Sequence, residues 1–310
     1  MKQLGNSQIS FSVVTTVYNE ADSIVELLTS LFIQTVRPKE IVVVDAGSND
    51  KTAARIKEYG QKNRQIPINF LMEKGVNRSK GRNLGIERAK EDHIAVIDAG
   101  CAAHKHWLER FAHQFAIDPR VEVVAGFYRT HPGTVLERCF APYLAVMPDQ
   151  IDSGNYLPSS RSVAFTRKAW EKAGKYPEQL ETCEDLVFAA KLKAICQLVV
   201  EPDAFVVWRL PKNWEQFFRQ VRGYARGDVE AWYRPHLIKI MTVWLRYGVF
   251  VLLPPLFFLY LLYPALKFFR YVPSFTGLLL LPTVQLIADT AVITGCVEGG
   301  LSLIRRRIRR

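Results

Sequence analysis

The chain has 310 residues and a formal net charge of +11, so it is long enough for one large α/β domain and a smaller region. Residues 1–208 carry 26 Lys and Arg against 25 Asp and Glu, while residues 209–310 carry 15 against five. A nearly neutral front part excludes the usual charge pattern of a nucleic-acid binder. Excess positive charge around an apolar tail is typical of a protein that faces anionic lipid headgroups.

The first half of the chain alternates short β-rich apolar runs with segments of helical spacing. The predicted strands are 12–17, 40–44, 68–72, 93–97 and 121–125, and the predicted helices are 22–34, 51–59, 79–89 and 106–115. This alternation favours an α/β fold with a mostly parallel sheet and helices on both faces.

Polar clusters follow three of the predicted strands. They are Tyr18-Asn19-Glu20, Asp45-Ala46-Gly47-Ser48 and Asp98-Ala99-Gly100. Since ligands of such sheets bind beyond the carboxyl ends of the strands, these clusters predict a ligand site.

The pattern loosens from Tyr128 to about Trp208, and a basic amphipathic helix follows at 213–226. Its apolar face holds Trp214, Phe217, Phe218, Val221 and Ala225, and its basic face holds Arg219, Arg222 and Arg226. We interpret 209–240 as an interfacial segment, with an ordinary surface helix of the domain as the alternative.

Two apolar runs occupy 241–300, and each is long enough to cross a bilayer core of about 30 Å. The first run is 247–266; the second is 271–288, is interrupted by Asp289, and resumes to Val297. They predict two transmembrane helices followed by a basic tail at 301–310 on the cytoplasmic side. Lys267 and Arg270 in the short connection leave open a hairpin that only dips into the membrane, and a buried hairpin of a soluble protein is the other alternative.

No secretory signal is predicted at the N-terminus. The five cysteines are scattered and lack metal or redox spacing, which indicates free thiols in a reducing compartment.

Two segments, FSVVTTVYNE (11–20) and EIVVVDAGSND (40–50), together resemble the opening of the family-2 inverting glycosyltransferases, which have the GT-A fold. The resemblance implies a nucleoside diphosphate-sugar donor, such as a UDP- or GDP-sugar. It assigns donor binding to Thr16, Tyr18, Glu20, Asp45, Arg82 and Asp98. For Asp45, the implied role is to accept hydrogen bonds from the nucleobase.

The segment GVNRSKGRNLGIERAK (75–90) resembles the family's Arg-Asn-x-Gly helix through Arg82, Asn83 and Gly85. Asp98 stands at the first acid of the family's metal-binding Asp-x-Asp motif, and Gly100 replaces the second acid. A divalent cation, Mg²⁺ or Mn²⁺, is therefore a doubtful cofactor, with Asp98 as its one predicted ligand.

The segments LPSSRSVAF (157–165) and GKYPEQLETCEDLVFAAKL (174–192) resemble the family's acceptor side, with Glu184-Asp185 opening a helix. An inverting transfer needs a base for the acceptor hydroxyl, and the resemblance implies that Asp185, beside Glu184, is that base. The segment 205–228 resembles the family's end segment, in which Arg222 and Arg226 are candidate diphosphate contacts and Trp208 replaces a frequent His.

These patterns predict a GT-A catalytic domain at 1–208 that acts at the cytoplasmic face of the inner membrane. The predicted acceptor is a lipid-linked sugar or a polysaccharide, as in cell-envelope biosynthesis, and no nucleic acid is involved. Two alternatives stay open. One is a transferase acting on polyprenyl phosphate, and the other is a non-catalytic membrane protein that binds nucleotide-sugars.

Overall fold

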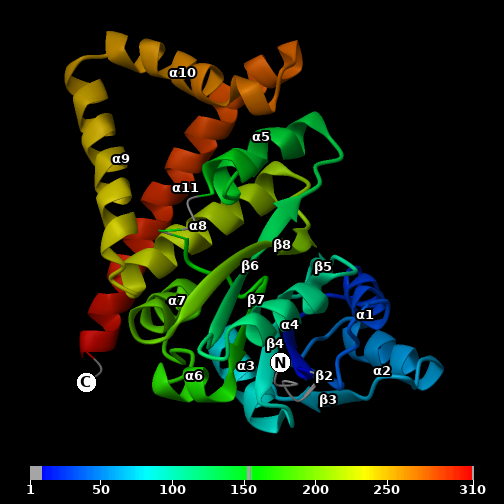
Figure 1. The fold of residues 1–310 in the computed structure, drawn as a ribbon. Coiled ribbons are helices and arrows are strands. Elements are labelled where there is room, and N and C mark those ends of the chain that lie inside the picture. The colour runs from blue at the N-terminus through cyan, green and yellow to red at the C-terminus, as the bar shows by residue number, and fades with distance from the viewer. Residues whose placement is uncertain (1–8, 152–153, 155, 309–310) are drawn as a thin grey trace. The chain divides into compact units, whose positions relative to one another are not determined.

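The computed structural model describes residues 9–151, 154 and 156–308, and its ribbon is drawn in Figure 1. Its contacts divide the chain into two compact units. We call residues 1–129, 152–179 and 185–208 the sheet unit, and residues 130–151, 180–184 and 209–310 the helical unit. The last two residues of the predicted basic tail lie outside the described residues.

The sheet unit is built around one β-sheet, and the strand order of this sheet is β3-β2-β1-β4-β7-β6-β8-β5. The strands are β1 (Phe11–Val17), β2 (Glu40–Asp45), β3 (Ile68–Met72), β4 (His93–Val96), β5 (Cys101–Ala103), β6 (Val123–Thr130), β7 (Val163–Thr166) and β8 (Leu198–Trp208). The first four pair in parallel, as predicted, whereas β7 runs antiparallel to β4 and β6, and β5 runs antiparallel to β8. The sheet is therefore mixed. Its antiparallel half falls mainly in the segment where the hydrophobic pattern loosens.

The predicted helices of the first half are all present, with bounds shifted by a few residues. The helices of this unit are α1 (Ile24–Phe32), α2 (Thr52–Lys62), α3 (Arg78–Arg88), α4 (Trp107–Ile117), α6 (Arg167–Lys172) and α7 (Glu184–Ile195). Side chains of α3, α6 and α7 form one buried cluster with β1, β2, β4, β6 and β7. Helix α3 lies close to β1 because Gly85 has no side chain: a Cβ there would stand 2.5 Å from Val14 Cγ1.

The helical unit contains α5 (Val135–Leu144), η1 (Pro148–Gln150), α8 (Trp214–Glu230), α9 (Arg234–Leu252), α10 (Pro255–Phe268), η2 (Phe269–Tyr271) and α11 (Phe275–Ile308). The predicted amphipathic helix is α8. Its Phe217 stacks on Phe140 of α5 with ring centroids 4.2 Å apart. Gly295 and Gly299 let α11 pack on the backbone of α8. Protein thus covers much of the apolar face of α8, and contact of this helix with a membrane interface stays a prediction.

The first predicted transmembrane run is divided between two helices. Helix α9 ends at Leu252 and α10 begins at Pro255, because proline fits the first turn of a helix but not its interior. The 14 residues of α10 are about 21 Å long at 1.5 Å per residue, which is shorter than a bilayer core. Among the described residues, α11 alone is long and apolar enough to cross a membrane, judged by length and composition.

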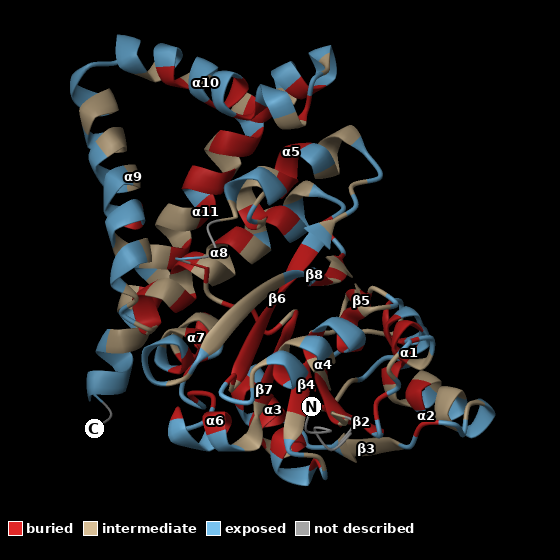
Figure 2. Ribbon diagram, in the orientation of Figure 1, coloured by how far each residue is buried: buried red, intermediate tan, exposed pale blue. Residues whose placement is uncertain are grey.

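Asp289, which interrupts the second apolar run, joins three helices of the helical unit. Its carboxylate pairs with Arg246 of α9 at 2.7 Å and accepts hydrogen bonds from Tyr260 of α10 at 2.7 Å and Tyr247 of α9 at 3.2 Å. Gln285 of the same helix donates to it at 3.0 Å. A buried charge is tolerated where it is paired and hydrogen-bonded in this way. The polar groups thus point inward, whereas Figure 2 shows long exposed stretches on α9 and α10.

Candidate active site

Two turns at the carboxyl ends of β1 and β2 form one edge of the candidate site. The strands pair in register, with Val17 opposite Asp45. The Asn19 amide donates to Ser48 Oγ at 2.9 Å, and the Glu20 amide donates to Thr52 Oγ1 at 2.8 Å. Asn19 has a φ of 55°, a left-handed conformation that Asn tolerates better than most residues. The spacing of the two motifs therefore reflects turns that are hydrogen-bonded to each other.

The predicted donor-binding residues of β1 lie along this edge. Tyr18 is exposed, with 57% of its surface accessible, and is free to cover a ligand. Glu20 accepts a hydrogen bond from Ser23, and its Oε2 lies 4.0 Å from where a Cβ on Gly100 would stand. Thr16 is packed under α3: its Cγ2 would lie 2.8 Å from a Cβ on Gly81. Glu20 thus borders the acidic turn after β4, Tyr18 is exposed at the end of β1, and Thr16 supports the start of α3.

Asp45 shapes the second turn with one of its oxygens. Its Oδ1 accepts hydrogen bonds from the amides of Gly47 at 3.0 Å and Ser48 at 2.7 Å. Its Oδ2 is buried and has no hydrogen-bond partner among the described residues. A buried acceptor without a partner is costly, so Asp45 is well suited to receive a donor group from a bound nucleobase.

Each of the three named residues in the Arg-Asn-x-Gly segment of α3 has a structural role of its own. Arg82 is buried and pairs with Asp98 at 2.6 Å. The Asn83 side chain accepts hydrogen bonds from the Trp170 ring at 3.1 Å and the Tyr176 amide at 3.0 Å. Gly85 allows the close approach to β1 described above. The segment therefore fixes the guanidinium of Arg82 against the acidic turn after β4.

Asp98 lies in a strongly cationic environment. Burial acts to raise the pKa of this carboxyl, but its net shift is downward. The charges of Arg82, Arg161 and Arg78 lower it, together with the hydrogen bond from Arg82. Arg78, the first residue of α3, thus also acts electrostatically on the candidate site.

The side chains around Asp98 do not fit a cation held by the protein alone. Arg82 already occupies one carboxylate oxygen of Asp98, and the surrounding guanidinium groups repel a cation. Gly100 has a φ of 77° and supplies no ligand. In the described part of the chain, no group of three or more His, Cys, Asp or Glu side chains is arranged to hold a metal. The arrangement is better suited to an anion such as a diphosphate.

The predicted base lies at the start of α7, which begins at Glu184. Asp185 is half-buried, and its Oδ2 accepts a hydrogen bond from Ser159 Oγ at 3.1 Å. Its Oδ1 accepts from the Leu186 amide at 2.9 Å. Glu184 is buried, so of the pair it is Asp185 that is available to a substrate. The Ser159 hydroxyl and the Leu186 amide thus hold the carboxylate of Asp185 in one orientation.

Sequence reasoning did not assign a role to Ser159 or Arg161. Arg161 Nη1 donates to Ser159 Oγ at 3.1 Å, and Ser159 in turn donates to Asp185. The guanidinium of Arg161 lies over the rings of Trp208 at 4.1 Å and Tyr128 at 4.9 Å. Both residues fall in the segment SSRS, but the sequence gives no sign that a serine there contacts Asp185.

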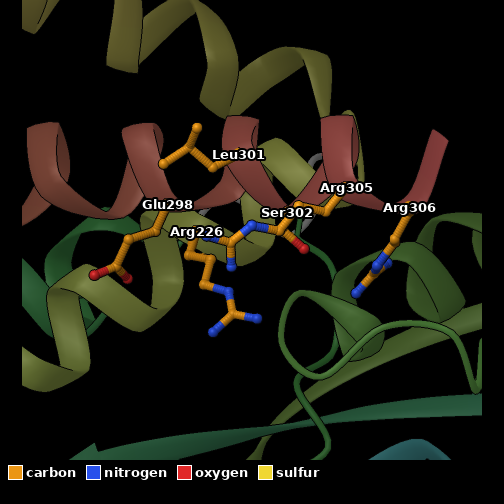
Figure 3. Close-up of a pocket in the computed structure, with 6 residues that line it drawn as sticks. All are labelled: Arg226, Glu298, Leu301, Ser302, Arg305 and Arg306. Carbon is orange, nitrogen blue, oxygen red and sulfur yellow. The ribbon is translucent and has the colours of Figure 1, made fainter. Parts of the chain in front are cut away.

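Arg222 and Arg226, the candidate diphosphate contacts, lie on α8 in the helical unit. Arg226 pairs with Glu230 at 2.8 Å, and Arg222 lies 3.7 Å from Glu298. Figure 3 shows Arg226 in a pocket of about 440 Å³ whose lining comes from α8 and α11. The other lining residues are Glu298, Leu301, Ser302, Arg305 and Arg306. These ion pairs give Arg222 and Arg226 a structural role, and their contact with a diphosphate stays a prediction.

The comparison with protein families matches residues 12–141 to the model described as Glycosyl transferase family 2. Glycosyltransferase AglE of Haloferax volcanii is 29% identical over 175 residues, which cover 54% of this chain and 56% of that protein. Chondroitin synthase of Pasteurella multocida is 25% identical over 58% of this chain and 19% of its own length. The chain therefore spans little more than half of the first relative and much less of the second.

Solved structures resemble a larger share of the chain. The mannosyltransferase PcManGT from Pyrobaculum calidifontis, solved with GDP-Man and Mn²⁺, has a TM-score of 0.60 at 18% identity and covers 95% of this chain and 88% of its own. S. aureus TarS 1–349, solved with UDP-GlcNAc, has a TM-score of 0.52 at 21% identity and covers 70% of this chain and 66% of its own. At such identities the likeness concerns the fold, which is the predicted GT-A fold; among the described residues one long apolar helix, α11, follows it.

Proposed function

The chain belongs to glycosyltransferase family 2 through residues 12–141, and from this premise we propose that it performs an inverting transfer at a membrane. The donor is a UDP- or GDP-sugar, and the acceptor is a lipid-linked sugar or a polysaccharide at the cytoplasmic face. The observation that carries this proposal is the presence, within one unit, of an oriented carboxylate at Asp185 and an arginine-bound carboxylate at Asp98.

The proposed reaction is an in-line displacement at the anomeric carbon of the sugar. The acceptor oxygen forms the new bond with a lone pair, and Asp185 accepts its proton. The bond from the anomeric carbon to the diphosphate breaks, and its electron pair leaves with the diphosphate oxygen. Ser159 orients Asp185 for this step. Arg82 supplies positive charge on the leaving-group side, where fixed charges lower the barrier most.

Ligand binding provides the first test of this proposal. We expect either UDP or GDP, with its sugar derivative, to raise the melting temperature of the full chain in detergent, because a ligand that binds only the folded state stabilises it. Asp45→Ala should abolish the increase, since it removes the proposed nucleobase acceptor. Asp203→Asn is a matched control, because Asp203 is an exposed carboxylate of the same unit. An absence of any increase with either nucleotide would contradict the proposed function.

Exposed apolar side chains support the proposed membrane attachment. In the helical unit they gather on α9, α10 and the start of α11, and include Leu245, Val251, Phe258, Leu262, Leu266 and Phe275. Burying such a surface in lipid gains about 25 cal/mol per Å², independently of salt. We expect the full chain to fractionate with membranes, and high salt not to release it. Release by salt alone would show that the basic residues, rather than the apolar surface, hold the chain on the membrane.

A further inference from the structure

Arg161 and Asp98 lie at the same edge of the sheet. Strand β7 runs antiparallel to β4, with Val163 opposite Val96. Arg161 precedes Val163 by two residues, and Asp98 follows Val96 by two residues. The pairing therefore brings the segment before β7 to the carboxyl end of β4, beside the turn that the donor-binding motifs surround (Figure 1).

Two aromatic rings hold the guanidinium of Arg161 at this edge. It lies 4.1 Å from the ring centroid of Trp208 and 4.9 Å from that of Tyr128. Trp208 pairs with Cys101 across β5 and β8, and the Cys101 amide donates to the Asp98 carbonyl at 3.3 Å. The rings thus belong to the same framework as the acidic turn. Stacking on aromatic faces suits arginine and restricts the freedom of its side chain.

Arg161 also connects the two carboxylates of the proposed reaction. It donates to Ser159, which donates to Asp185. The antiparallel pairing of β4 and β7 also places it at the same edge of the sheet as Asp98. Arg161 is therefore a fixed cation that reaches the proposed base through Ser159 and shares a strand edge with the arginine-bound carboxylate, where we expect the diphosphate of a bound donor.

We propose that Arg161 binds the diphosphate of the donor and stabilises the negative charge that develops on the leaving nucleoside diphosphate. This inference rests on the proposed transferase function. In the step described above, the electron pair of the broken bond moves to the diphosphate oxygen, and the fixed positive charge of Arg161 favours that movement. No proton or further reactant is needed, because a guanidinium stays protonated throughout.

The test compares the binding of a nucleoside diphosphate with the binding of the matching nucleoside. The full chain in detergent is titrated calorimetrically with UDP and uridine, and with GDP and guanosine, always with excess EDTA. We expect Arg161→Gln to weaken diphosphate binding by ~10- to 100-fold, the range for a lost charge-assisted hydrogen bond, and to leave nucleoside binding unchanged. Arg161→Lys, which keeps a charge but loses the stacking plane, should lose less than Arg161→Gln.

The chain offers a matched control in Arg129, which also lies in the sheet unit. Its guanidinium stacks 3.8 Å from the Phe205 ring and lies 3.6 Å from Asp203. We expect Arg129→Gln to change neither affinity. If Arg161→Gln fails to fold, Arg161→Lys tests the inference instead. Its affinity for the diphosphate should then fall while its affinity for the nucleoside stays unchanged.

Three outcomes would overturn the inference while leaving the transferase proposal in place. The first is unchanged diphosphate binding in the Arg161 variants. The second is an equal loss of nucleoside and diphosphate binding, which would mean a general disturbance of the fold. The third is wild-type diphosphate binding that requires added Mn²⁺ or Mg²⁺, because a metal would then supply the charge. Failure of the wild type to bind either nucleotide under any condition would instead remove both proposals.

Discussion

Charged side chains serve different purposes in the two units. In the sheet unit they gather at strand ends, where Arg82, Asp98 and Arg161 border the turns that the donor-binding motifs form. In the helical unit they neutralise one another inside the packing: Asp289 pairs with Arg246, and buried Glu230 lies 2.8 Å from Arg226 and 3.0 Å from Arg306. A charged residue in an apolar segment therefore indicates a ligand site only when its ion-pair partners do not fully neutralise it.

The first prediction tests whether Asp289 is structural, and it has the largest expected effect. Asp289→Ala leaves the mostly buried guanidinium of Arg246 without its counter-charge. Breaking a buried pair costs about 3–5 kcal/mol of stability, so the melting temperature of the full chain in detergent should fall markedly.

The control for this prediction is Glu298→Ala, which removes a half-exposed partner of Arg222. Exposed pairs contribute about 0–1 kcal/mol, so this variant should melt close to the wild type. Equal melting of the two variants would contradict the distinction between buried pairs in the helical unit and its surface pairs.

The second prediction concerns Asp185, the carboxylate of the sheet unit that we propose as the base. Asp185→Asn should reduce transfer by about a hundredfold or more, the usual range for the loss of a positioned base. Donor binding should stay intact, because Asp185 faces the acceptor in the proposed reaction. The measurements are sugar incorporation from the donor that the binding screen identifies, and calorimetric affinity for its nucleotide. Near-normal transfer by this variant would remove Asp185 from the mechanism and would favour a phosphate acceptor, which needs little base catalysis.

The third prediction concerns the close packing that places Arg82. A methyl group at position 85 would stand 2.5 Å from Val14 Cγ1, so Gly85→Ala should destabilise the chain by about 1–3 kcal/mol, the range for overpacking. Gly60→Ala in α2 is the control, since its Cβ would meet Ile68 at an ordinary 3.7 Å and alanine favours a helix. The melting temperature should therefore fall for position 85 and stay level or rise for position 60.

The sequence predicts the sheet unit better than the helical unit for a physical reason. Strand β1 and helix α3 combine a regular hydrophobic period with polar residues at their ends, so that both the element and its site residues can be recognised. Strand β8, at Leu198–Trp208, carries Glu201, Pro202 and Asp203 in its middle and has no clear period. Trp208, the last residue of this strand, nevertheless provides the ring on which Arg161 stacks.

In the helical unit, composition alone does not distinguish a membrane span from a packed helix. The run 247–266 is uncharged, but Pro254 and Pro255 divide it, and only the structure shows where each part ends. The contact of Asp289 with Arg246 joins residues 43 positions apart, and local periodicity does not reveal such a pairing. The close packing of Gly295 and Gly299 on α8 is likewise a matter of tertiary contact.

The last prediction has the smallest expected effect and concerns divalent cations. The sheet unit surrounds Asp98 with its own arginine charges, and Gly100 and Trp208 supply no ligand where acidic or imidazole groups would hold a metal. Trp208 instead stacks on Arg161. Because fixed guanidinium groups meet the charge of the leaving group, most of the transfer rate should remain in excess EDTA. The measurement is sugar transfer with EDTA alone, and with EDTA followed by an excess of Mn²⁺ or Mg²⁺. Complete loss that either ion restores would mean that Asp98 and the donor's diphosphate together hold a cation. In that case Asp289 would keep its structural role in the helical unit, but the sheet unit would need a bound cation to meet the charge of the leaving group.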